Sequence, residues 1–120
     1  MSANRSFAHA VIDAIDGIYH ALVEQPNFRI QVLLTGLAVA GGFALRFGPW
    51  QWAVVTIACA FVLAAELFNT GLEHAIDLYK PENHPLARSA KHAGAAAVLV
   101  AAIAAAIAGI CIYGSALLGK

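Results

Sequence analysis

The sequence predicts an all-helical membrane protein in which an N-terminal amphipathic surface helix precedes three transmembrane helices in an oligomeric bundle. Of its 120 residues, 61% are hydrophobic and only 12% are charged, whereas about a quarter of an ordinary soluble domain is charged. The charged residues are also far apart, and long uncharged runs separate them. Seven basic residues balance seven acidic ones, so the chain has no net positive charge that would attract nucleic acid.

The first segment, residues 5–25, is expected to form a helix on the membrane surface. Apolar residues recur here at steps of three and four, the spacing of one face of an amphipathic helix. They are Phe7, Val11, Ile15, Ile18 and Leu22. Charged and histidine side chains mark the opposite face. Pro26 is expected to end this helix, because proline cannot continue the backbone hydrogen bonding.

Three uncharged runs are long enough to approach or exceed the thickness of a bilayer. They cover residues 30–45, 47–65 and 93–119, and a membrane-spanning helix needs about 17–25 residues. The arginines that flank the first run can extend toward the head groups and lengthen that span. We therefore expect transmembrane helices over 29–49, 52–78 and 86–118, with a cytoplasmic loop over 79–85, in a single membrane domain over 1–120.

The basic residues predict the orientation of these helices. Five of them fall on one side of the membrane, which the positive-inside rule makes cytoplasmic. They are Arg5, Arg29, Lys80, Arg88 and Lys91. All seven acidic residues and all five histidines fall on the same side. The N-terminus is thus predicted inside the cell and the C-terminus outside. The side chains capable of acid–base or metal chemistry are predicted on the cytoplasmic face.

The third predicted span carries a stripe of small residues, Ala97, Ala101, Ala105 and Gly109. Small side chains at every fourth position let helix backbones approach closely in lipid. The stripe is equally compatible with a contact between identical subunits and with packing inside one subunit.

The second span continues into a polar stripe of Glu66, Asn69, Glu73 and Asp77. At about 100° per residue, these side chains fall within an arc of roughly 80° on one helix face. Carboxylates stacked in this way repel one another, and an acid at the edge of hydrocarbon is costly. The stripe therefore predicts a cationic partner. The candidates are Lys91, Arg88 or a divalent metal, for which oxygen ligands suit Mg²⁺.

These residues resemble a family of small integral-membrane lipid kinases that comprises prokaryotic diacylglycerol kinase and undecaprenol kinase. Residues 65–77 are similar to the family's segment E-x-x-N-[ST]-x-x-E-x-x-x-D. Residues 90–99 are similar to its segment A-K-D-x-x-[AS]-A-A-V-L, and residues 26–30 to the N-F-R-I that opens its first span. The resemblance covers nearly the whole chain.

The resemblance implies a homotrimeric lipid kinase of phospholipid biosynthesis in the bacterial inner membrane, with sites shared between subunits. Such an enzyme transfers the γ-phosphate of MgATP to the primary hydroxyl of undecaprenol or diacylglycerol, with Mg²⁺ as cofactor and ATP as co-substrate. By position, Glu66 is expected to be the catalytic base. The positions expected to bind nucleotide or cofactor are Asn69, Glu73, Asp77, Glu82, Asn83, His84, Lys91 and His92.

The resemblance also implies two metal-binding positions, Glu73 and an acidic residue three positions before Phe28. That second position is Gln25 here, and its neighbour is Glu24. Because an amide is a weaker magnesium ligand than a carboxylate, either Glu24 takes over or fewer charges hold the metal. The family's aspartate after the lysine is His92 here, which removes an acid near the nucleotide.

A small oligomeric transporter with Glu66 as its carrier site is the alternative function. A carrier acid is expected near the bilayer midplane. Glu66 lies instead toward the cytoplasmic end of its span, and this position favours the kinase.

Overall fold

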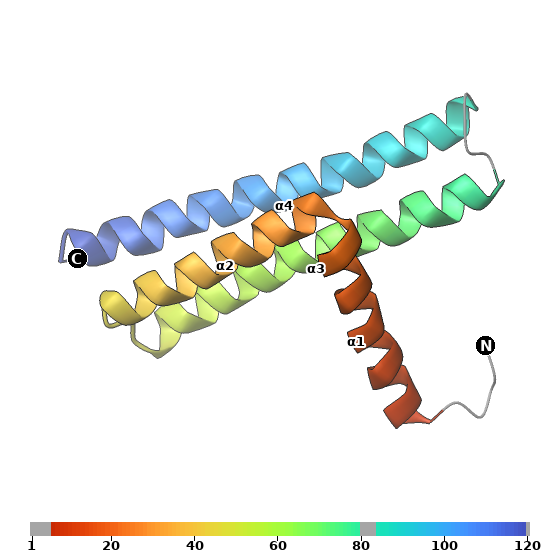
Figure 1. The fold of residues 1–120 in the computed structure, drawn as a ribbon. Helices are drawn as coiled ribbons and strands as arrows, with labels where there is room; N and C mark the ends of the chain where they lie inside the picture. Colours follow the sequence, from red (N-terminus) through yellow and green to blue (C-terminus); the bar gives the residue numbers. More distant parts are fainter. Residues whose placement is uncertain (1–5, 80–83, 120) are drawn as a thin grey trace.

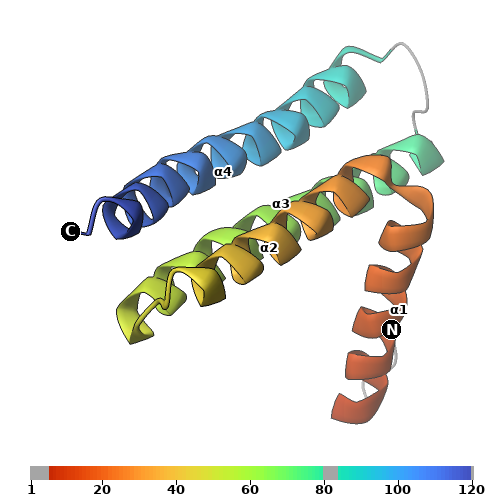
Figure 2. The ribbon, with the colours of Figure 1, turned by 60° about the vertical axis from the view of Figure 1, so that its left-hand side comes forward.

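The computed structural model describes residues 6–79 and 84–119, and these residues form four α-helices and no strand (Figure 1). The helices are α1 (Phe7–Glu24), α2 (Pro26–Ala44), α3 (Pro49–Tyr79) and α4 (Pro85–Leu117). The last three run alongside one another, and α1 leaves this bundle at a steep angle (Figures 1 and 2). All three are long and apolar enough to cross a membrane. The predicted all-helical fold class is confirmed, while the oligomeric state stays a prediction.

A proline begins each of the three long helices. Pro26, Pro49 and Pro85 each occupy the first helical residue, where the missing N–H breaks no hydrogen bond and the fixed φ already suits a helix. His84 caps α4, because its Nδ1 accepts a hydrogen bond from the Leu86 N–H at 3.1 Å. Local sequence therefore sets where these helices start.

The corner between α1 and α2 is held by Arg29. Gln25 is extended (φ −113°), as the residue before a proline prefers to be, and α1 therefore ends at Glu24. The Arg29 guanidinium reaches back and donates to the carbonyl oxygens of Leu22 at 3.0 Å and Val23 at 2.8 Å. A cation at these carbonyls also suits the helix dipole. From the sequence alone, Arg29 is expected only at the membrane edge, and nothing in the sequence indicates this cap.

A sharp turn at Arg46 ends α2 at Ala44, well before the predicted boundary at residue 49. The Arg46 N–H donates to the Phe43 carbonyl at 3.2 Å, and the Phe47 N–H donates to the Gly42 carbonyl at 3.0 Å. This pair of bonds closes a Schellman turn, which needs a left-handed residue. Arg46 supplies it with a φ of 58°, although residues other than glycine rarely adopt that conformation.

The other predicted boundaries shift by a few residues. The predicted ranges 52–78 and 86–118 become Pro49–Tyr79 and Pro85–Leu117. The predicted surface helix 5–25 becomes Phe7–Glu24. Residue 5 and residues 80–83 of the predicted loop 79–85 lie outside the described residues.

An aromatic cluster joins α2, α3 and α4 at the end of the bundle away from α1. Phe47 is buried at its centre, and the ring centroids of Trp52 and Tyr113 lie 5.7 and 4.9 Å from that of Phe47. The Tyr113 hydroxyl donates to the carbonyl oxygen of Ala38 on α2. This bond satisfies a polar group inside the bundle, so α4 is tied to α2 as well as to α3.

Most of the small-residue stripe of α4 faces α3 within the subunit, while Ala97 at its start is exposed. Ala101 is only 1% exposed, and Ala105 and Gly109 line a crevice whose opposite wall includes Val55 of α3. Three of the four stripe residues thus pack inside the subunit, and a contact between identical subunits stays a prediction. Many large apolar side chains elsewhere on the three long helices are exposed, as expected where lipid or further copies surround a helix.

Gly42 is expected to tolerate no side chain. An added Cβ would lie 2.6 Å from Trp52 Cη2 and 3.1 Å from Phe47 Cδ2. Gly42→Ala should therefore lower the free energy of unfolding by about 1–3 kcal/mol. Gly36→Ala in the same helix is the matched control, because its Cβ would meet nothing within 4 Å. Unfolding in detergent micelles compares both with the parent, and equal stability of the two variants would contradict the packing.

Candidate active site

The polar stripe of α3 lies where this helix leaves the apolar part of the bundle. Glu66 is 7% exposed and is the single buried polar or charged side chain in the described part of the chain. Asn69 and Glu73 are half-buried, and Asp77 is exposed. At 1.5 Å per residue Glu66 is about 26 Å along the helix from Pro49, close to the far edge of a hydrocarbon core about 30 Å thick. Exposure thus increases along the stripe from Glu66 to Asp77.

A hydrogen bond joins the two middle members of the stripe. The Asn69 side-chain Nδ2 donates to Glu73 Oε1 at 3.2 Å, across one helical turn. This bond orients the Glu73 carboxylate and offsets part of its charge. Asn69 thus contacts Glu73 within a single helix, and its predicted support of the nucleotide site stays a prediction.

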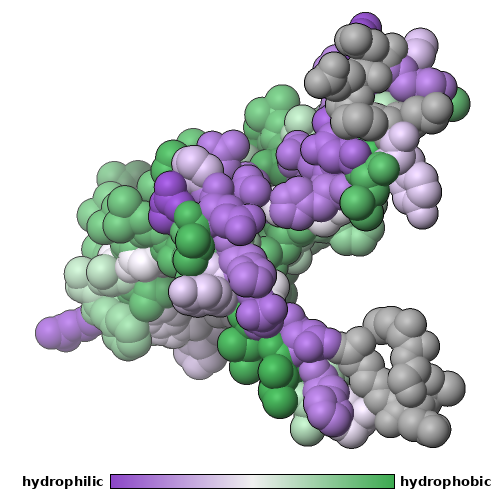
Figure 3. Space-filling model, turned by 45° about the vertical axis from the view of Figure 1, so that its right-hand side comes forward, coloured by the Kyte–Doolittle hydropathy of each residue, from purple (hydrophilic) through white to green (hydrophobic). Residues whose placement is uncertain are grey.

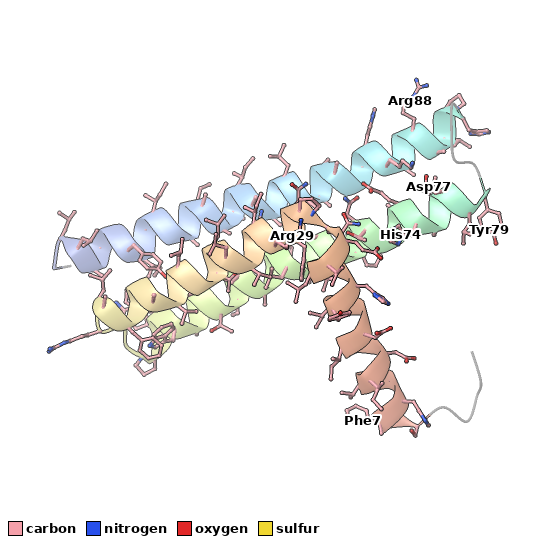
Figure 4. The ribbon with its side chains drawn as sticks, viewed as in Figure 1. Phe7, Arg29, His74, Asp77, Tyr79 and Arg88 are labelled. Atoms are coloured by element: carbon pink, nitrogen blue, oxygen red, sulfur yellow. The ribbon has the colours of Figure 1, made fainter. Side chains whose placement is uncertain are left out.

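The cationic partner of the stripe is Lys91 of α4, whose Nζ lies 2.5 Å from Asp77 Oδ1. Arg88, the other basic candidate, is exposed and points away from α3 (Figure 4). Lys91 neutralises only the outermost carboxylate. Across residues 6–79 and 84–119, no lysine or arginine forms a salt bridge with Glu66 or Glu73, so these two acids keep their capacity for a further cation.

A cavity of about 520 Å³ opens between α1 and the face of α3 that adjoins the polar stripe. Its α1 side includes His20 and Glu24, with Gln25 at the corner, and its α3 side includes Thr70 and His74. Figure 4 shows His74 on α3 close to the junction with α1. Both candidates for the second metal position, Glu24 and Gln25, therefore line one cavity.

The predicted metal-binding residues do not all line this cavity. Glu73 belongs to the stripe and is absent from the cavity wall that Glu24 and Gln25 help to form. Within the described ranges, no three His, Cys, Asp or Glu side chains are placed to hold a metal ion. Mg²⁺ commonly binds through one or two carboxylates and the phosphates of a substrate. The donors present therefore fit a magnesium nucleotide better than a bare ion.

The other predicted nucleotide contacts lie at the start of α4. His84 is the N-cap of this helix, and His92 is exposed beside Lys91. Glu82 and Asn83 lie outside the described residues. Figure 3 shows hydrophilic side chains along one side of α1 and at this end of the bundle, with mostly hydrophobic side chains over the rest of the visible face.

Comparison with known proteins identifies the chain's relatives. Residues 13–113 match the family described as prokaryotic diacylglycerol kinase. The undecaprenol kinase of Bacillus subtilis is 31% identical over 109 residues, which are 91% of this chain and 85% of the relative. The diacylglycerol kinase of Synechocystis is 41% identical over 98 residues, which are 80% of this chain and 55% of that longer relative. That of Helicobacter pylori is 32% identical over 88 residues, 73% of this chain and 69% of the relative.

The ion pair between Lys91 and Asp77 is expected to contribute little to stability. Their side chains are 31% and 48% exposed, and pairs this exposed are typically worth about 0–1 kcal/mol. Asp77→Asn, Lys91→Gln and the double variant should each change the free energy of unfolding by no more than about 1 kcal/mol. Unfolding of all three in detergent measures the coupling. A coupling energy well above that limit would show that the pair is a structural requirement of the α3–α4 contact.

Proposed function

Because this chain belongs to the prokaryotic diacylglycerol kinase family and is an ATP-dependent lipid kinase, we propose that it phosphorylates undecaprenol or diacylglycerol with MgATP. The burial of Glu66 at the edge of the apolar span is the observation that carries this proposal. A carboxylate there is within reach of a hydroxyl that is anchored in the bilayer by its lipid chains. The more exposed end of the stripe remains accessible to a nucleotide from the cytoplasm.

In the proposed reaction, Glu66 accepts the proton of the lipid's primary hydroxyl. The hydroxyl oxygen forms a bond to the γ-phosphorus, while the bond from that phosphorus to the β,γ-bridging oxygen breaks. The products are the lipid phosphate and ADP, and the proton stays on Glu66 until it passes to water. Phosphoryl transfer depends mainly on positioning and on offsetting charge, so a soluble nucleotide-binding domain is not required.

Magnesium would be held by Glu73 together with phosphate oxygens of ATP, and Glu24 or Gln25 would supply the second metal-binding position at the cavity beside α1. When bound, it offsets the negative charge of the phosphates during transfer. Asn69 supports this arrangement by fixing the Glu73 carboxylate at 3.2 Å from its Nδ2. Lys91 and the residues around His84 and His92 are proposed to contact the nucleotide, in part by exchanging Asp77 for a phosphate as the partner of Lys91.

The enzyme is proposed to act as a homotrimer in the bacterial inner membrane, with its N-terminus and active site on the cytoplasmic side. The exposed apolar surface of the long helices supports a membrane assembly. Undecaprenol is the acceptor we expect to be preferred, since the match to an undecaprenol kinase covers 91% of the chain. Diacylglycerol is the competing acceptor, because the 41% identical relative is named for it.

Glu66→Gln is expected to abolish phosphorylation of either alcohol while leaving assembly and nucleotide binding intact. The substitution removes the proton acceptor but keeps the side-chain shape, and it relieves the cost of a carboxylate near hydrocarbon. The experiment supplies the purified parent protein with MgATP and each alcohol in turn, and measures lipid phosphate and ADP. The variant is then compared by the same assay and by its oligomeric state in detergent.

Near-normal turnover of Glu66→Gln would refute the assignment of Glu66 as the base. Loss of activity only through loss of assembly would do so as well. A parent protein that produces no lipid phosphate from either alcohol would overturn the proposed function itself, and transport coupled to Glu66 would become the leading alternative.

The metal assignment predicts opposite effects for two charge changes. Glu73→Gln should weaken apparent Mg²⁺ affinity and lower turnover, because an anionic oxygen ligand is lost. Gln25→Glu should strengthen Mg²⁺ binding and raise turnover, because it adds a carboxylate to the cavity wall. Titration of Mg²⁺ at fixed ATP measures, for each variant, the Mg²⁺ concentration that gives half-maximal turnover.

Glu24→Gln is the matched comparison, because Glu24 adjoins Gln25 on the same cavity. It should be nearly silent if position 25 is the ligand position. If Glu24→Gln abolishes activity and Gln25→Glu has no effect, Glu24 is the ligand and the assignment to position 25 is wrong.

A further inference from the structure

Gly94 of α4 lies directly against Asn69 of the stripe. A Cβ added at Gly94 would lie 2.2 Å from Asn69 Oδ1 and 3.1 Å from Leu72 Cδ2. The first distance is far below a van der Waals contact, so no residue with a side chain fits unless Asn69 moves. The observed position of the Asn69 side chain therefore requires a glycine at position 94 of α4.

Asn69 Oδ1 is buried and has no hydrogen-bond partner among the residues that the structure describes. Buried polar atoms usually have a partner, because leaving one unpaired costs free energy. The opposite orientation of the amide would turn Oδ1 toward Glu73, where two acceptors would repel each other. The observed orientation instead lets Nδ2 donate to Glu73, and the unpaired oxygen is its consequence.

We propose that Gly94 is a positioning residue, which leaves room for Asn69 Oδ1 and so keeps Nδ2 bonded to the Glu73 carboxylate. The inference rests on the proposed function, in which Glu73 is a ligand of Mg²⁺. Asn69 is then an outer partner of a metal ligand, and Gly94 acts through Asn69 without touching metal or nucleotide. Partners of this kind orient ligands, and their loss commonly weakens metal binding.

A methyl group at position 94 would displace the end of the Asn69 side chain more than it would displace the helices. Oδ1 is a terminal atom that moves when the amide rotates, and Leu72 has to yield only a few tenths of an ångström. A groove of about 290 Å³ beside Asn69, which Phe68 also lines, gives the displaced amide space. Gly94→Ala is therefore expected to disturb the Asn69–Glu73 bond while leaving the fold stable.

The test compares Gly94→Ala with Gly114→Ala in the chain of residues 1–120 in lipid nanodiscs. Both glycines belong to α4, and a Cβ at Gly114 would meet nothing within 4 Å. Binding of Mn²⁺ with a non-hydrolysable ATP analogue, followed by electron paramagnetic resonance, should weaken about tenfold in Gly94→Ala. It should be unchanged in Gly114→Ala. The Mg²⁺ midpoint of lipid phosphorylation should shift in parallel, with little change in the unfolding temperature.

A role through Asn69 predicts that the two substitutions do not add. Gly94→Ala placed in an Asn69→Ala background should leave Mn²⁺ affinity at the value of Asn69→Ala alone, because the amide on which Gly94 acts is gone. The double variant also keeps the test valid if Gly94→Ala alone unfolds, since removing the amide makes room for the methyl. An additive loss, or unchanged Mn²⁺ affinity in a folded Gly94→Ala, would overturn the inference.

Failure of this inference differs from failure of the proposed function. A parent protein that binds Mn²⁺ with nucleotide and phosphorylates lipid, but whose Gly94→Ala variant does the same, overturns only the role of Gly94. A parent protein without lipid phosphorylation overturns the proposed function and this inference with it.

Discussion

The packing of α4 against α3 is the interaction on which the rest of this structure depends. Inside a bilayer, apolar burial drives little association between helices, because lipid chains are as apolar as leucine. Contact must come from close approach and from polar bonds. Close approach dominates here, since Ala101 is only 1% exposed, whereas the partly exposed Lys91–Asp77 pair near the start of α4 adds no more than about 1 kcal/mol. Between them, Gly94 brings the backbone of α4 against Asn69.

This packing divides the half of α3 that ends at Tyr79 into two faces with different neighbours. Asn69 and Asp77 contact α4, whereas Thr70 and His74 face the cavity beside α1. The position of α1 is fixed by the Arg29 cap at the corner, which therefore also places the cavity wall. A single helix can present acids to one neighbour and a cavity to another because successive residues differ by about 100° around its axis.

The sequence was sufficient for the fold class because charge spacing and helical periodicity are properties of the chain alone. The long uncharged runs, and prolines such as Pro26 and Pro85, mark spans and their starts with no tertiary information. The end of α2 was predicted too late, since a non-glycine residue such as Arg46 gives no sign that it will adopt a φ of 58°. The arc of the stripe was predictable, but its separation from Glu24 depends on how α1 docks. No periodicity within one helix contains that information.

Under the proposed function, the burial gradient along α3 would let one helix serve two substrates of opposite solubility. A lipid hydroxyl is confined near the membrane surface, whereas a nucleotide with several negative charges cannot leave water without a large desolvation cost. Their meeting point must therefore lie at the boundary between the two environments. Glu66 at 7% exposure lies on the apolar side of that boundary, and the exposed Asp77 lies on the wet side three helical turns away. Asn69 and Glu73 lie between these two residues. A nucleotide bound there could keep its charged phosphates in water, while its γ-phosphoryl group reaches the hydroxyl oxygen of a lipid that remains in the bilayer. A soluble kinase needs a closing lid to exclude water from its phosphates, but here the membrane itself can limit water at the acceptor. Under the proposed function, this is how a chain of 120 residues would accommodate such a site.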